Sequence, residues 1–188
     1  MRNLLMYATV AFVIVGTTMV LPAHAQAPAE AAFSPIVENP TFTSVQLETT
    51  VNRPVAEVWA RIGKFCDVAE WFPIASGCKI LSGRESEVGA VRSVATEILV
   101  AKTQYSYTYS QHLRAGSPYD HYHGTLEARP MDGSTTKLIY TLMFDNSLLA
   151  DDAAREKDKT GRKAMFSRAM GNMKILAEGG RLPAPPAR

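Results

Sequence analysis

The pattern of apolar and polar positions predicts a strand and two short helices at the start of the folded part. From Thr43 to Val51 apolar and polar residues alternate, which is typical of a half-buried strand. Pro54 follows at a position where a helix can begin without losing a hydrogen bond. Apolar residues then recur at helical spacing as far as Phe65, and a second short turn carries Trp71–Pro73.

The middle of the chain consists of strand-like runs with few helix signals. Glycine, proline and Asp-Gly turn signals separate most of these runs. The break between the third and fourth runs carries no such signal, so that boundary is the least defined. The expected strands are 78–81, 88–95, 98–102, 104–112, 119–129 and 135–146.

The last part of the chain predicts one long amphipathic helix at about 148–177. Asp151 and Asp152 favour its N-terminal end through the helix dipole, and the pair Gly179–Gly180 ends it. Gly161 and Gly171 each weaken it by roughly 1 kcal/mol. The expected apolar stripe consists of Met165, Phe166, Ala169, Met170, Met173, Leu176 and Ala177.

This order of elements predicts an α+β domain in which a curved antiparallel sheet of six to seven strands wraps around the terminal helix. A sheet with one apolar face needs a cover, and the helix supplies it. Space left between sheet and helix would form a ligand pocket. We expect this domain at residues 42–180, after a flexible leader at 26–41 and before a disordered tail at 181–188.

The first 25 residues have the pattern of a signal peptide. Arg2 is their only charged residue, and an apolar stretch at 4–21 precedes Ala23-His24-Ala25, a small-x-small cleavage signal. We expect cleavage after Ala25, a periplasmic or secreted protein, and no membrane span afterwards. An uncleaved N-terminal anchor is the alternative, because the apolar stretch reaches the lower limit for crossing a bilayer.

Charge and cysteine content exclude some function classes. The part beyond residue 25 carries 19 basic and 18 acidic side chains, without the basic clusters that nucleic-acid binding requires. Its two cysteines, Cys66 and Cys78, are either a disulfide in an oxidising compartment or two separately buried thiols. Two cysteines alone do not make a metal site.

Several short motifs occur in a specific order along the chain. They are Val51–Trp59 (VNRPVAEVW), Phe65, Trp71–Pro73, Gly89–Arg92 and Tyr105–Tyr107. Together with the terminal helix they resemble the SRPBCC superfamily, the START-like proteins that include the polyketide cyclase/dehydrase and lipid-transport group and relatives of the birch pollen allergen. The resemblance implies a helix-grip fold with an internal hydrophobic cavity.

The candidate ligand-binding residues are mostly aromatic. Tyr105, Tyr107 and Tyr109 alternate along one strand face, so they either line the pocket or are ordinary core residues. Arg92 resembles the family's strand arginine, and it either anchors a polar ligand group or pairs with a nearby glutamate at position 85, 87 or 97. The full set expected to bind ligand is Trp71, Arg92, Tyr105, Tyr107, Tyr109, Tyr122, Tyr140, Phe166, Met170 and Met173.

Three histidines lie close together in sequence, at His112, His121 and His123. Such a group suggests a metal site. The alternation of their strand instead places His121 and His123 on the polar face, with Tyr122 and Leu126 on the apolar one. We therefore expect solvated histidines and no metal.

The sequence contains no nucleophile elbow, phosphate-binding glycine loop or zinc-protease motif. We expect an exported protein that binds or carries a small hydrophobic molecule and needs no cofactor. A cyclase/dehydratase-like enzyme and an accessory protein of a periplasmic redox enzyme are the alternatives. The sequence does not identify a protein partner.

Overall fold

The computed structural model describes residues 39–72, 74–111, 116–117 and 119–183 of the 188-residue chain. The predicted signal peptide and its cleavage site lie outside the described residues, as do Pro73, His112 and the end of the predicted tail. Only residues 39–41 of the predicted leader are described. The backbone N–H of Thr41 donates to Asp145 Oδ1 at 2.8 Å, and its carbonyl accepts from Asn146. This end of the leader is therefore tied to the sheet.

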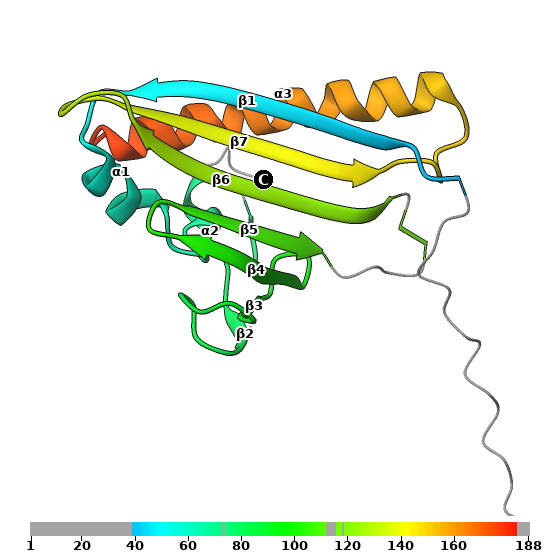
Figure 1. The fold of residues 1–188 in the computed structure, drawn as a ribbon, viewed down its shortest axis with the longest axis horizontal. Coiled ribbons are helices and arrows are strands. Elements are labelled where there is room, and N and C mark those ends of the chain that lie inside the picture. Colours follow the sequence, from blue (N-terminus) through cyan, green and yellow to red (C-terminus); the bar gives the residue numbers. More distant parts are fainter. Residues whose placement is uncertain (1–38, 73, 112–115, 118, 184–188) are drawn as a thin grey trace, which may run out of the picture. The chain divides into compact units, whose positions relative to one another are not determined.

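Seven antiparallel strands form one sheet in the order β1-β7-β6-β5-β4-β3-β2 (Figure 1). The first strand, β1, lies at one edge of the sheet and pairs with the last strand, β7. The strands β2 to β7 form a meander, in which each pairs with the next along the chain. The expected antiparallel sheet is confirmed at seven strands. Their bounds are β1 (Phe42–Val51), β2 (Ile80–Ser82), β3 (Val91–Arg92), β4 (Glu97–Thr103), β5 (Ser106–Gln111), β6 (Asp120–Pro130) and β7 (Thr136–Asp145).

Two strand boundaries differ from the prediction because of tight turns. Ala95 and Thr96 have positive φ angles of 49° and 53°, which end the predicted strand 88–95 early. Two left-handed residues in succession are typical of a primed hairpin turn, where Asn-Gly is the usual pair. Gln104 and Tyr105 form the turn between β4 and β5, so β5 begins at Ser106. That turn lies at the break that the sequence left undefined.

Three helices complete the domain: α1 (Val55–Ile62), α2 (Val68–Trp71) and α3 (Asp152–Ala177). The long helix begins at Asp152 instead of Leu148 because the carboxylate of Asp151 accepts a hydrogen bond from the N–H of Ala154, which makes Asp151 its N-cap. At the other end Gly179 adopts φ 88°, and Gly180 N–H donates to the carbonyl of Ile175. This is the Schellman arrangement that favours glycine.

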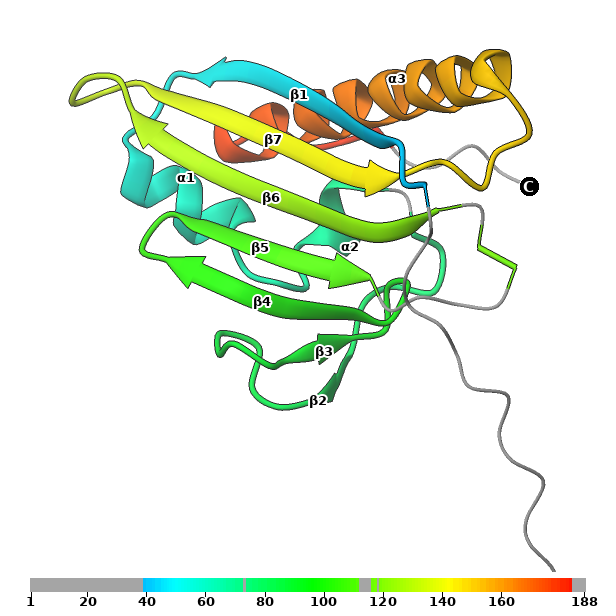
Figure 2. The ribbon, with the colours of Figure 1, turned by 45° about the vertical axis from the view of Figure 1, so that its right-hand side comes forward.

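All three helices pack on one side of the sheet (Figures 1 and 2). The long helix α3 contacts β1, β7 and both short helices, while α1 contacts β6. In β6 the apolar side buries Tyr122, Leu126 and Ala128, and the histidines face the other way. The helix-grip arrangement expected from the sequence is confirmed. No helix in the described ranges has the length and apolar character needed to cross a membrane.

We predict that Gly171→Ala stabilises the protein. This residue is exposed in the middle of α3, and an added Cβ would meet no other atom within 4 Å. Alanine should raise the free energy of unfolding by about 0.5–1 kcal/mol, because glycine is the weaker helix former. Urea unfolding measures the change.

The matched control is Gly124→Ala in β6. Its Cβ would lie 2.3 Å from Cζ of Tyr109, so this variant should lose about 1–3 kcal/mol. A loss of stability in Gly171→Ala comparable to that in Gly124→Ala would contradict the prediction.

Candidate functional site

A cavity of about 340 Å³ lies between the sheet and the helices α2 and α3. Its walls come from α2 and the loop after it, the β3–β4 hairpin, strands β5 to β7 and α3. Six of the ten residues expected to bind ligand line this space. They are Trp71, Arg92, Tyr109, Tyr122, Tyr140 and Phe166.

The other four expected residues lie outside the cavity wall. Tyr105 is in the β4–β5 turn, where its hydroxyl accepts a hydrogen bond from Gln104. Tyr107 is buried, but its ring packs between Trp59 and Phe65, at 5.9 and 5.7 Å between centroids. Met170 and Met173 are buried in the core under α3, toward its C-terminal end.

Several wall residues were not in the predicted set. Phe72 and Ile74 follow α2, and Tyr119 precedes β6. Met165 belonged to the predicted helix stripe, but the sequence did not separate stripe residues that reach a cavity from those that fill the core. Arg162 lies one turn before Phe166 on the same buried face of α3, and that spacing could have identified it.

Tyr140 lies at the centre of the aromatic wall. Its ring centroid is 4.9 Å from that of Phe166 and 6.2 Å from that of Trp71. Its hydroxyl oxygen lies 2.8 Å from that of Tyr109, so one phenol donates to the other. The cavity therefore combines apolar ring surfaces with a fixed pair of hydroxyl groups.

The buried phenols stay neutral at physiological pH. Burial, followed by the neighbouring phenol of Tyr140, raises the pKa of Tyr109 well above 10. Burial, followed by Tyr107, does the same to the pKa of Tyr140. Burial also raises the pKa of Tyr122 to about 12. These hydroxyls can donate or accept hydrogen bonds, but they are poor general bases near pH 7.

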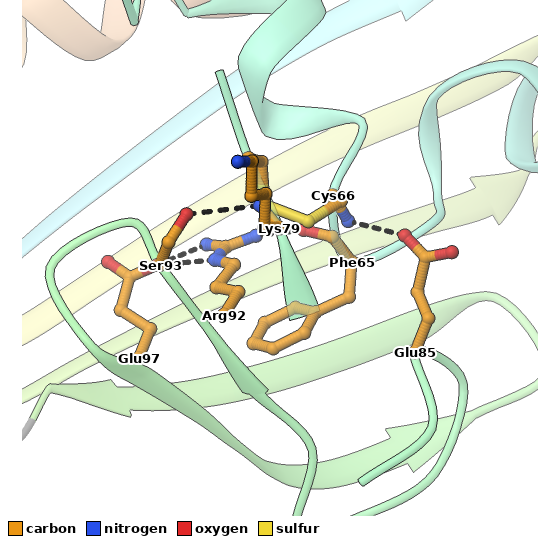
Figure 3. The surroundings of a disulfide bond; sticks show 8 residues. Phe65, Cys66, Lys79, Glu85, Arg92, Ser93 and Glu97 are labelled. Atoms are coloured by element: carbon orange, nitrogen blue, oxygen red, sulfur yellow. Dashed lines mark hydrogen bonds and ion pairs between the residues drawn. A yellow bond between two sulfur atoms is a disulfide. The ribbon is translucent and has the colours of Figure 1, made fainter. Parts of the chain in front are cut away.

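A buried ion pair lies next to Tyr109 in the cavity wall, with the Arg92 guanidinium 4.8 Å from the Tyr109 ring centroid. Figure 3 shows its two members, Arg92 and Glu97. Arg92 and Glu97 face each other across the β3–β4 hairpin, and two nitrogens of the guanidinium contact Glu97 Oε2 at 2.6 and 2.5 Å. Burial acts to lower the pKa of Arg92. The phenol of Tyr107 and the carboxylate of Glu97 raise it by more, so the pKa lies above its ordinary value. Arg92 therefore pairs with Glu97, which is one of the two sequence-based alternatives, and it also lines the cavity. Its role as an anchor for a polar ligand group stays a prediction.

The same two side chains are held by further contacts. Arg92 also donates to the carbonyl of Phe65, and its guanidinium lies 4.2 Å from the Phe65 ring centroid. Gln111 donates to the other oxygen of Glu97 at 3.0 Å. These contacts fix the hairpin against the loop after α1.

Cys66 and Cys78 form a disulfide, with their Cα atoms 5.4 Å apart. The segment between them carries α2 and the cavity residues Trp71, Phe72 and Ile74. Cys66 N–H also donates to Glu85, and Lys79 N–H donates to Ser93 of the hairpin (Figure 3). One wall of the cavity is thus a covalently closed loop, bonded at Cys66 to the β2–β3 connection and, just after Cys78, to the β3–β4 hairpin.

The two described histidines lie on the sheet face away from the cavity. His121 is exposed, with Nε2 3.6 Å from Asp120 Oδ2, and His123 Nδ1 lies 2.7 Å from the carbonyl of His121. The ranges that the structure covers contain no group of three metal-ligating side chains.

Comparison with known proteins gives both a family match and similar folds. Residues 43–178 match the family described as polyketide cyclase / dehydrase and lipid transport. No curated protein matches the chain in sequence.

The solved structures with this fold share little sequence with the chain. A protein from Thermobifida fusca is 21% identical with a TM-score of 0.60, covering 74% of this chain and 97% of that one. A protein from Nitrosospira multiformis is 24% identical with a TM-score of 0.54, covering 70% and 96%. The Zhui aromatase/cyclase from a Streptomyces species is 19% identical with a TM-score of 0.56, covering 74% and 99%.

We predict strong coupling between Arg92 and Glu97. Arg92→Met and Glu97→Leu should each lower the free energy of unfolding by about 3–5 kcal/mol, because each leaves a buried charge without its partner. The double variant should lose less than the sum by at least about 1 kcal/mol. Urea unfolding of the four proteins gives the coupling energy.

The exposed pair Arg61–Glu70, with nitrogen and oxygen 2.7 Å apart, is the matched control. Arg61→Met should cost under about 1 kcal/mol. Additive losses at Arg92 and Glu97 would show that the pair does not act as a unit.

We predict that stability falls steeply above pH 10. Unfolded phenols ionise near pH 10, whereas Tyr109 and Tyr140 in the folded protein hold their protons well above that pH. The unfolded state therefore releases more protons as pH rises, and each such tyrosine lowers stability by about 1.4 kcal/mol per pH unit above 10. For Tyr122 this loss of stability levels off near pH 12, because its pKa in the folded protein is about 12.

Urea unfolding at pH 9, 10.5 and 11.5 measures this slope. Tyr140→Phe should have a shallower slope than the wild-type protein. Phenolate absorbance that accounts for every tyrosine at pH 10.5, in a protein that is still folded, would be the opposite result.

Proposed function

Because this chain belongs to the polyketide cyclase/dehydrase and lipid transport family, we propose that it is an exported protein that binds and carries a small hydrophobic molecule. The observation that carries this proposal is the cavity of about 340 Å³ with aromatic walls between the sheet and α3. Mostly apolar clefts and cavities of this size with a few fixed polar groups are typical ligand sites.

The cavity volume limits the size of the ligand. At the packing density of protein interiors, about 0.74, the space of about 340 Å³ holds about 250 Å³ of ligand atoms. That corresponds to roughly fifteen non-hydrogen atoms at the same density. A molecule of two or three fused rings, or a medium-length acyl chain, fits this limit.

The polar groups of the wall support a ligand with at least one hydrogen-bond acceptor. The indole N–H of Trp71 is buried and has no hydrogen-bond partner among the described residues. An unsatisfied buried donor costs about 1–3 kcal/mol, and a ligand oxygen would remove that cost. The hydroxyl pair of Tyr109 and Tyr140 lies in the same wall.

The protonation states favour binding over cyclase or dehydratase chemistry. The phenols are neutral because burial raises the pKa of Tyr109 and Tyr140. Glu97 is held by Arg92 and Gln111, so its carboxylate is already used as an acceptor. None of these groups has the features of a general base ready to take a proton from a ligand.

The disulfide supports export. Structural disulfides persist in oxidising compartments and are rare where thiols are kept reduced. The bond between Cys66 and Cys78 fits the periplasmic or secreted location that the signal-peptide pattern predicts.

Native mass spectrometry of the protein purified gently from a periplasmic extract tests this function. We expect a reproducible additional mass that disappears on extraction with organic solvent. Ile74→Trp, which places a larger side chain in the cavity wall, should reduce the ligand-bound fraction at least fivefold. Ile175→Trp, the same change at an exposed position of α3, should leave it unaltered.

The test also separates the alternatives. A mass without any ligand, together with no uptake from a panel of lipids, quinones and aromatic compounds, would disprove the carrier function. Conversion of an added polyketide-like compound, lost in Tyr109→Phe with binding retained, would identify an enzyme.

A further inference from the structure

Arg162 lies where the cavity meets a second hollow. This hollow is a surface groove of about 470 Å³ along the N-terminal half of α3. Tyr119, Arg162 and Met165 line both the groove and the cavity. A ligand that occupies the cavity and extends toward solvent along this side would pass the guanidinium of Arg162.

The Arg162 side chain is enclosed on several sides. It is 9% exposed, and its guanidinium carbon lies 4.2 Å from the ring centroid of Tyr119, 4.6 Å from that of Phe144 and 5.2 Å from that of Tyr122. Asp158, one helical turn earlier, accepts from Nε at 2.8 Å. The hydroxyls of Tyr119 and Tyr122 also interact with the guanidinium. A guanidinium has five N–H donors, so these contacts leave donor capacity for another acceptor.

Packing does not explain a charge at this position. Arg162 occupies the buried stripe of α3, one turn before Phe166, where the other residues are apolar. Buried ion pairs give little net stability compared with apolar side chains of similar volume. A retained cation that faces two connected hollows is therefore a candidate ligand contact.

The charges that line the two hollows favour an anion at this junction. In the cavity Arg92 and Glu97 balance each other. In the groove Lys157 and Arg162 face the single carboxylate of Asp158 among the described lining residues. The deep end of the cavity is thus apolar and neutral overall, whereas the outer end, at the groove, is positively charged.

We propose that the ligand is an organic acid whose apolar body fills the cavity and whose carboxylate binds Arg162 at the mouth of the groove. This inference rests on the proposed ligand-binding function. Arg162 is then the residue that selects acids over neutral molecules of the same shape, since a planar guanidinium matches the two oxygens of a carboxylate.

Two matched probes test the selection: 2-naphthoate and 2-naphthalenemethanol, titrated into the full-length protein by calorimetry. The wild-type protein should bind naphthoate at least tenfold more tightly than the alcohol. The double variant Arg162→Met with Asp158→Asn keeps the net charge of the protein and removes the buried pair together. It should bring the two affinities within about twofold, through weaker binding of naphthoate alone.

Three further measurements complete the design. The double variant Arg168→Met with Glu156→Gln changes two exposed residues of α3 without altering net charge, and it should keep the tenfold preference. Arg162→Lys should keep a reduced preference for naphthoate over the alcohol, because lysine retains the positive charge but lacks the planar guanidinium. Near-ultraviolet circular dichroism checks that each variant is folded.

Each outcome decides a different claim. Equal wild-type affinities for the two probes overturn the role of Arg162 while the hydrophobic cavity stands, and this holds even if the variants do not fold. A preference that survives in folded Arg162→Met with Asp158→Asn also overturns it. No binding of either probe, with no uptake from the wider panel, overturns the proposed function itself.

Discussion

The positive charge of Arg92, 1% exposed inside the domain, is the constraint on which the cavity depends. A buried guanidinium has to be neutralised and hydrogen-bonded, and the fold supplies Glu97 across the hairpin and the Phe65 carbonyl from the loop after α1. Two segments far apart in sequence are therefore held at fixed positions. The space between them and α3 persists because the polar contacts prevent the wall from collapsing inward.

The fold could be predicted because its main signals are local. Alternation in β1 and β6 assigned the buried side chains correctly, as Val45 and Leu126 show. Asp151 and the Gly179–Gly180 pair marked the two ends of α3 to within a few residues. The β3–β4 turn was expected a few residues too late, because Ala95 and Thr96 adopt left-handed conformations that their side chains disfavour. That turn places Arg92 opposite Glu97.

The site was predicted less completely, because which buried residues face an empty space depends on distances between elements. Tyr107 and Tyr109 lie on the same side of β5, yet only Tyr109 reaches the cavity, since the rings of Trp59 and Phe65 fill the space beside Tyr107. Arg162 was not among the residues expected to bind ligand. Its helical spacing from Phe166 places it on the buried stripe, but no local pattern connects α3 with Tyr119 and Phe144, whose rings pack on its guanidinium. The pairing of the cysteines also stayed open, since it depends on the 5.4 Å Cα separation.

The closed loop between Cys66 and Cys78 has a consequence for how such a protein can diversify. Its ends are fixed by the disulfide and by hydrogen bonds from two backbone N–H groups to Glu85 and Ser93, so the loop's own cavity-facing side chains take no part in these contacts. Positions such as Phe72 and Ile74 are thus free to change while the backbone that carries them keeps its place. Natural or laboratory selection can therefore alter ligand preference through this one short loop, without changes in the sheet or the long helix.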